Sequence, residues 1–293
     1  MKSFLRNFLM FILPATALIV SCNDDSDEIK SGESAITPEE VRASMQAEDL
    51  SNELDNVIDL MVSDDFLNTA SKDETTANRG WWMPECLTVT SEATGEGFTV
   101  TMDFGEGCEM HHGKVFSGSF TVLYTTVNDS ETMTFNRNST VTFDNFAVDS
   151  VTVNGTKSFE HSFTEGENPM TVAVTDIQMT WEDDTSFTIS SEKTREWVEG
   201  FHTGAAWNES AFLITGNASV TRRDGGTFTS EIITPLRAEF SCHYIVSGVL
   251  TYSRNGETAE VDFGDGTCDD KAMYTGPDGE TVEITLEKGW EKD

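Results

Sequence analysis

Hydrophobic and polar residues alternate with a period of two along most of the segment 86–293. Residues 98–104 (FTVTMDF) are the clearest case, and residues 141–143 and 187–189 repeat the pattern. Such alternation predicts strands with one buried and one solvated face. No stretch of helical length separates the strands, which disfavours parallel βαβ units. We therefore predict a mainly β domain over 86–293: an antiparallel meander of roughly a dozen strands, folded as a sandwich or as a curved sheet.

Glycine-containing segments punctuate this domain and predict its turns. Four of them are 154–155 (Asn-Gly), 223–226 (Arg-Asp-Gly-Gly), 255–256 (Asn-Gly) and 278–279 (Asp-Gly). Glycine, and Asn or Asp beside it, adopts the positive φ angles that tight hairpin turns require. We predict a hairpin turn at each of the four positions.

A helical periodicity precedes the β-domain. The tetrapeptide Thr-Pro-Glu-Glu at 37–40 has the composition of a capping box, with proline in the first helical position. An apolar stripe follows at helical spacing, and acidic residues such as Asp49, Glu53, Asp55 and Asp59 fall mostly outside it. We predict a helical segment over 37–67 that docks on the sheet and a linker over 68–85. The stripe consists of Leu50, Leu54, Val57, Ile58 and Met61.

The first residues have the organisation of an export signal. Lys2 and Arg6 precede an apolar run over 8–20, which is shorter than the roughly 20 residues of a spanning helix. The run ends in Leu-Ile-Val-Ser before Cys22, which resembles a bacterial lipobox. The resemblance implies a lipoprotein signal peptide over 1–21 and membrane attachment through acyl chains on Cys22. The alternative is an ordinary secretory peptide followed by an unrelated cysteine.

Residues 22–36 are predicted to form a tether, because the acidic run Asn-Asp-Asp-Ser-Asp-Glu at 23–28 is too polar to pack. This run is similar to the acidic export signal that follows the lipidated cysteine in many Bacteroidota lipoproteins. The similarity implies an outer-membrane protein at the cell surface. Attachment to the periplasmic leaflet is the alternative.

The charge balance excludes one class of partner. The chain has 293 residues, with 52 Asp and Glu against 18 Lys and Arg, and a net charge of -34. Nucleic-acid binding is excluded, because proteins that follow phosphates need clustered cations. The same charge repels anionic lipid headgroups, which argues against a membrane-binding face beyond the acyl anchor.

Two related segments contain the remaining cysteines. Segments 86–108 and 242–268 each contain a strand, a glycine turn and a second strand ending in Asp-Phe-Gly-acid-Gly before a cysteine. The first and last residues of a hairpin face each other. The simplest of the three connectivities therefore pairs Cys86 with Cys108 and Cys242 with Cys268. Such bonds fit an oxidising envelope compartment, with about 3 kcal/mol from each. Zinc is the competing interpretation, but close Cys-x-x-Cys pairs are absent.

Two groups of side chains are candidate ligand sites. Trp181, Trp197 and Trp207 lie among acidic residues and are a candidate platform for sugar rings; the alternative is that they belong to the core. A second group has carboxylates that are candidate calcium ligands, although the spacing is not that of an EF-hand and solvated turns are the alternative. This second group is Asp262, Asp265, Asp269 and Asp270.

No catalytic residue or cofactor is assigned. A Gly-x-Ser-x-Gly elbow is absent, and His111 and His112 would point to opposite faces of a strand. Paired carboxylates for glycosidic cleavage stay open, because so many acids place some pairs close together by chance.

The lipobox, the acidic tether, the Asp-Phe-Gly-x-Gly-(Thr)-Cys hairpins and the segments 143–146 (FDNF) and 153–156 (VNGT) together resemble a group of uncharacterised, flavobacterial-type envelope lipoproteins from Bacteroidota. The resemblance implies a location and a build without supplying a site. The expected function is non-enzymatic binding of a glycan, lipid or protein partner. The alternatives are a polysaccharide hydrolase with paired carboxylates and a periplasmic carrier of a hydrophobic ligand.

Overall fold

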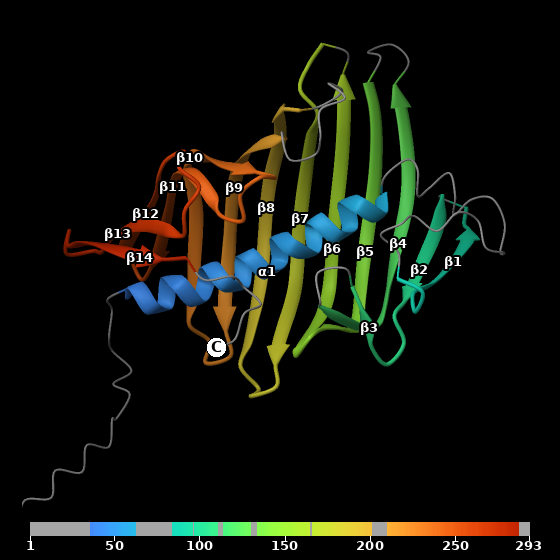
Figure 1. The fold of residues 1–293 in the computed structure, drawn as a ribbon, viewed down its shortest axis with the longest axis horizontal. Helices are drawn as coiled ribbons and strands as arrows, with labels where there is room; N and C mark the ends of the chain where they lie inside the picture. The colour runs from blue at the N-terminus through green and yellow to red at the C-terminus, as the bar shows by residue number, and fades with distance from the viewer. Residues whose placement is uncertain are drawn as a thin grey trace, which may run out of the picture. The chain divides into compact units, whose positions relative to one another are not determined.

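The computed structural model describes residues 36–62, 84–95, 97–110, 114–129, 134–164, 166–200 and 210–286. These residues form one helix and a single antiparallel sheet of fourteen strands (Figure 1). The elements are α1 (Pro38–Val62), β1 (Thr88–Ala93), β2 (Phe98–Asp103), β3 (Cys108–Glu109), β4 (Val115–Asp129), β5 (Thr134–Val148), β6 (Val151–Thr164), β7 (Met170–Trp181), β8 (Ser186–Glu199), β9 (Ala211–Arg222), β10 (Thr227–Glu239), β11 (Ile245–Arg254), β12 (Glu257–Asp265), β13 (Lys271–Thr275) and β14 (Thr281–Thr285).

The strands follow one another across the sheet in chain order, and only β3 lies off this path, paired with β4. The sheet is open, with β1 and β14 at its two edges. The predicted mainly β antiparallel meander is confirmed, in its form as one sheet rather than a sandwich. Within the described residues, no helix has both the length and the apolar character needed to cross a bilayer.

Three of the four predicted turns join neighbouring strands, at 223–226, 255–256 and 278–279. The prediction of a turn at Asn154-Gly155 is wrong, because both residues lie inside β6. The hairpin between β5 and β6 instead turns at Asp149, which has a φ of 50°. The Asn154 carboxamide oxygen accepts a hydrogen bond from the backbone N–H of Asn145 (2.8 Å), where the register between β5 and β6 shifts.

Helix α1 crosses one face of the sheet, which we call the inner face (Figure 1). The Tyr274 hydroxyl of β13 donates a hydrogen bond to the Ile36 carbonyl just before the helix, and Lys157 of β6 contacts Asp55 near its other end. Alternate residues of each strand point to this face, so Val151, Val153 and other apolar residues are buried beneath or beside the helix.

The apolar stripe of α1 joins the core of the sheet. Leu50, Leu54 and Ile58 pack with the inner residues of β2 to β9, and Val41 packs with those of β9 to β14. The predicted docking of the helix is confirmed for these residues. The described part of the helix ends at Val62. Three stretches of the predicted segments lie outside the described residues: 22–35 of the tether over 22–36, which includes Cys22, 63–67 of the helical segment over 37–67, and 68–83 of the linker over 68–85.

Register shifts and glycines with positive φ interrupt the long strands. Gly155 in β6 and Gly216 in β9 have φ values of 116° and 127°. A Cβ atom on either would lie 2.3 and 2.2 Å from the carbonyl oxygens of Asp176 and Glu192, respectively, on the neighbouring strand. Only glycine fits such positions. Glycines and bulges of this kind bend a sheet, which allows its inner face to follow the helix.

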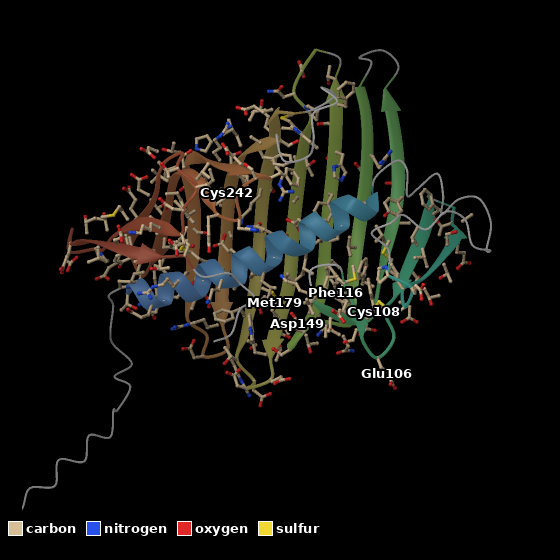
Figure 2. The ribbon with its side chains drawn as sticks, in the orientation of Figure 1. Glu106, Cys108, Phe116, Asp149, Met179 and Cys242 are labelled. Atoms are coloured by element: carbon tan, nitrogen blue, oxygen red, sulfur yellow. A yellow bond between two sulfur atoms is a disulfide. The ribbon has the colours of Figure 1, made fainter. Side chains whose placement is uncertain are left out.

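The two cysteine pairs lie at disulfide distance, as predicted. The Cα atoms of Cys86 and Cys108 are 5.5 Å apart, and those of Cys242 and Cys268 are 5.7 Å apart. Each bond spans a hairpin, β1–β2 or β11–β12, whose strands pair antiparallel. Figure 2 shows Cys108 toward the β1 edge of the sheet and Cys242 toward the β14 edge, so the two bonds stabilise separate parts of the sheet.

Candidate functional site

The structure does not bring Trp181 and Trp197 of the predicted tryptophan platform together. Trp181 lies at the β7–β8 turn, where its ring packs edge-on against Phe187 with 5.4 Å between centroids. Trp197 lies toward the other end of β8. Phe187 and Trp197 are ten residues apart on that strand, or roughly 33 Å. Trp181 and Trp197 are therefore too far apart to form one stacking surface for a sugar chain. Trp207 lies outside the described residues.

The four predicted calcium ligands do not converge. Among the described residues, no group of three or more His, Cys, Asp or Glu side chains is arranged to hold a metal ion. Asp262, Asp265 and Asp269 each accept a hydrogen bond from the backbone N–H two residues further on, and Asp270 follows them in the β12–β13 connection. These hydrogen bonds belong to solvated turns, which was the alternative interpretation.

The side chains of the inner face differ between the part of the sheet under helix α1 and the part beside it. One row of cross-strand neighbours runs through Thr175, Ser191, Ala218 and Ser230 on β7 to β10. These small side chains let a helix approach the sheet closely. The row continues into Lys157 of β6. The charged contacts between helix and sheet lie along or next to this row.

The first charged contact involves Glu40 at the start of α1. Its carboxylate accepts two hydrogen bonds from the Arg254 guanidinium (2.8 and 3.0 Å), and Arg222 lies 3.2 Å away. Glu40 also completes the predicted capping box, because its Oε2 accepts the Thr37 N–H (3.2 Å) and its N–H donates to the Thr37 hydroxyl (3.3 Å). Burial raises the pKa of Glu40, but the bonds from Arg254 and Thr37 outweigh it and hold that pKa below its usual value.

Two further acids lie along the same side of the helix. Glu48 accepts hydrogen bonds from Lys193 Nζ of β8 (2.9 Å) and from the Ser230 hydroxyl of β10 (3.0 Å). Asp55 pairs with Lys157 Nζ, which is fully buried and also donates to the Ser51 carbonyl. Burial lowers the pKa of Lys157, although the adjacent Asp55 carboxylate opposes the shift.

The helix therefore buries a polar stripe beside its apolar one. Ser44, Glu48, Ser51 and Asp55 recur at spacings of four, three and four residues and are all buried. Asp55, one of the acids that fall mostly outside the apolar stripe, faces the sheet and pairs there with Lys157. The signal in the sequence is Lys157, which occupies an inward position between Gly155 and Phe159 in the alternation of β6. A lysine at such a position requires a buried counter-charge.

A second row of polar residues crosses the inner face beside the helix. Arg137 on β5, His161 on β6, Thr171 on β7 and Arg195 on β8 are consecutive cross-strand partners. Their Cβ atoms are about 5 Å apart from strand to strand. The row contains two guanidinium groups, and Arg195 lines a small cavity together with Asp55 of the helix. We call these four residues the Arg–His–Thr–Arg row.

His161 occupies the middle of this row. Its Nδ1 lies 3.0 Å from the Thr171 hydroxyl, and its ring stacks on Phe159 with centroids 6.1 Å apart. Its Nε2 is buried and has no hydrogen-bond partner among the described residues. Burial, followed by the charges of Arg137 and Arg195, lowers the pKa of His161 from 6.5 to about 4. The imidazole is therefore neutral at pH 7.

Apolar side chains border the row on two sides. Toward the helix lies a small cavity of about 20 Å³, lined by Thr171 and Arg195 together with Phe159, Ala173, Ile214 and helix residues. Toward the strand ends, Trp197 packs on Phe212 (4.9 Å between centroids), Arg195 lies 5.4 Å above the same ring, and Phe240 extends the aromatic group with 45% of its surface exposed.

A second pocket, of about 500 Å³, lies where α1 begins, between Ile36–Pro38 and the β13–β14 hairpin. Three carboxylates line it, those of Glu257, Asp278 and Glu280, together with Tyr274. The Tyr274 hydroxyl is engaged by the Ile36 carbonyl.

Comparison of the chain with protein-family models, with curated proteins and with solved structures found no significant match. The case for a function therefore depends on the side chains described above and on the N-terminal sequence.

Replacing Asp55 with asparagine leaves the Lys157 ammonium buried without its counter-charge. We expect Asp55→Asn to lower the free energy of unfolding by about 3 kcal/mol, measured by urea denaturation. The double variant Asp55→Leu/Lys157→Met removes both charges and is expected to recover most of that loss.

The matched control is Glu283→Gln, which breaks the exposed pair between Lys271 and Glu283 (2.9 Å). Exposed pairs contribute little, so the unfolding midpoint of this variant should stay at the wild-type value. Equal effects of Asp55→Asn and Glu283→Gln would contradict the role given to the buried pair.

The low pKa of His161 predicts a pH-dependent stability. Between pH 6.5 and 4 the unfolded chain binds a proton at this residue and the folded chain does not, so stability falls as the pH falls through this window. From pH 7 to pH 5 the contribution is about 2 kcal/mol. In urea titrations at pH 7 and pH 5, wild type should lose about 2 kcal/mol more unfolding free energy between the two pH values than His161→Gln does. The other ionisable groups are the same in both proteins, so their contributions cancel in the comparison. If the unfolding free energies of wild type and His161→Gln changed equally with pH, the lowered pKa of His161 would be refuted.

Proposed function

We propose that this protein is a lipid-anchored binding protein of a bacterial cell envelope, without enzymatic activity. Cys22 follows a signal-peptide core in a lipobox-like sequence, and the acidic run after it provides a tether. Two cysteine pairs at disulfide distance fit an oxidising compartment outside the cytosol. The proposed location is the outer membrane, with the folded part at the cell surface.

The observation that carries the binding function is the engagement of the helix carboxylates. Glu40, Glu48 and Asp55 are the acids that α1 buries or half-buries against cations of the sheet. A general acid or base must exchange its proton with a substrate, whereas these carboxylates fasten α1 to the sheet.

The carrier of a hydrophobic ligand is the second candidate, and one observation favours it. Strands β4 to β8 are 12 to 15 residues long and present large apolar residues on one face, which a single helix covers. The helix fills the space that a carrier would leave for its cargo, so this function requires α1 to move. The binding function requires no such movement and is preferred.

The anchor is tested by mass spectrometry of the N-terminal peptide from envelope fractions. We expect a diacyl or triacyl group on Cys22 in the wild-type protein. Cys22→Ser should abolish acylation and release the protein from the membrane fraction or leave it unprocessed, whereas Ser26→Ala in the tether should change nothing. An unmodified thiol on Cys22 would contradict the anchor.

Surface location is tested separately, by protease treatment of intact cells. Release of the folded part supports the cell surface. Protection of that part until the outer membrane is opened would place it on the periplasmic leaflet.

A further inference from the structure

We infer that the pocket at the start of α1 binds a linear aliphatic polyamine, with its ammonium groups on separate carboxylates and its methylene chain on apolar walls. This inference deepens the proposed binding function by naming a ligand class, and it rests on that function. The pocket, of about 500 Å³, lies between residues 36–38 and the β13–β14 hairpin, next to the first turn of the helix (Figure 1). Its volume is in the range of small-molecule sites.

The first step concerns an inward position of the sheet that stays exposed. Val282 of β14 is the cross-strand partner of Tyr274 and therefore points to the inner face. Its inward neighbours Tyr274 and Ile284 are 4% and 3% exposed, but Val282 is 37% exposed. An apolar wall left open to water inside a concave site favours a ligand with an apolar part. The other apolar side chains that line the pocket are those of Ile36, Pro38 and Pro277.

Gly276 leaves space inside the pocket, between a carboxylate and an aromatic ring. A Cβ atom at this position would lie 3.0 Å from Asp278 Oδ1 and 3.4 Å from the Tyr274 ring. Gly276 does not have a positive φ, so its backbone conformation does not require glycine. Because carboxylates and aromatic rings both attract alkylammonium groups, the space that the missing side chain leaves suits such a group.

The next step concerns charge. Three carboxylates line the pocket, those of Glu257, Asp278 and Glu280, and its described lining contains no Lys, Arg or His side chain. The Oε2 atom of Glu257 is buried and has no hydrogen-bond partner among the described residues. Arg254, the cross-strand neighbour of Glu257, donates two hydrogen bonds to Glu40 of the helix. A buried carboxylate oxygen without a donor is costly, and an ammonium group of a ligand can supply that donor.

The acids of the helix and of the hairpin act on the same wall of the pocket. Burial raises the pKa of the Tyr274 hydroxyl, and the charges of Asp278, Glu39 and Glu40 raise it further. Among the described residues, no three acids converge in the way that a metal ion requires. Negative charge that is spread over a pocket matches a ligand with several separated ammonium groups better than one compact metal ion.

The test uses the full chain from envelope extracts in nanodiscs of zwitterionic lipid and measures binding of radiolabelled spermidine by equilibrium dialysis. Wild type is expected to bind spermidine saturably, above the level of empty nanodiscs, and more weakly as the salt concentration rises. Octamethylenediamine should compete, because it combines an alkyl chain with two ammonium groups. Octanediol, its neutral analogue, should not compete, and neither should Mg²⁺ at the same concentration.

Asp278→Asn and Glu257→Gln should each weaken spermidine binding about tenfold, the effect of losing one charge-assisted hydrogen bond. The matched control is Asp269→Asn, in the β12–β13 connection at the other end of β13. Asp269 and Asp278 each accept a backbone N–H two residues further on, at 3.0 Å, so the two substitutions remove the same charge from the same kind of turn. Asp269→Asn should bind as wild type does. Near-UV circular dichroism checks that each variant is folded, and Glu280→Gln, at an exposed position, serves as a further variant should Glu257→Gln disturb folding.

Wild-type affinity in the folded Asp278→Asn and Glu257→Gln variants would overturn the inference. So would an equal loss in Asp269→Asn, equal competition by octanediol or Mg²⁺, or the absence of saturable binding. The two proposals fail separately. An unacylated Cys22 with carboxylate-dependent spermidine binding refutes the anchor and leaves the site in place. An acylated Cys22 without spermidine binding refutes the site alone.

Discussion

The structure depends on the match between the acids of helix α1 and the cations of the sheet. A wide open sheet with one apolar face cannot remain in water unless something covers that face. Here one helix covers it, and three carboxylates, Glu40, Glu48 and Asp55, meet cations on four different strands. Buried ion pairs contribute little net stability compared with apolar contacts, but a mispaired buried charge is costly. The pairs therefore determine where along the sheet the helix lies.

Two sets of forces cooperate at the beginning of the helix. Glu40 accepts a backbone bond that starts the helix and side-chain bonds that attach it to β9 and β11. Arg254 and Arg222 in turn lie over the ring of Phe228, at 4.5 and 5.5 Å. Helix initiation and docking are thus coupled through one side chain.

Much of this fold follows from local patterns in the sequence. Alternation in segments such as 98–104 predicts the strands, Thr37 and Glu40 predict the helix start, and the repeated Asp-Phe-Gly hairpins predict the cysteine pairs. Asn154-Gly155 shows the limit of such patterns, because glycine adopts a positive φ at a register shift within a strand, as Gly155 does at 116°, as well as at a turn.

The candidate site was harder to predict, because it depends on contacts distant in sequence. The apolar stripe of the helix does not indicate that Asp55 faces the sheet, because its partner Lys157 is 102 residues away in the sequence. The tryptophans failed for a geometric reason. Trp181 immediately precedes the β7–β8 turn, and antiparallel pairing moves Trp197 to the far end of the next strand. Two residues that are near each other in sequence can therefore lie far apart in space when they belong to the two strands of a long hairpin.

Hydrogen exchange measured by mass spectrometry tests most directly whether α1 is an integral part of the core. If the ion pairs and the apolar stripe bind the helix into the sheet, amides of Val41–Ile58 open only with the central strands β6 to β8, and both segments exchange with the same free energy of opening. Exchange of the helix many-fold faster than that of these strands, while the sheet stays protected, would contradict the account.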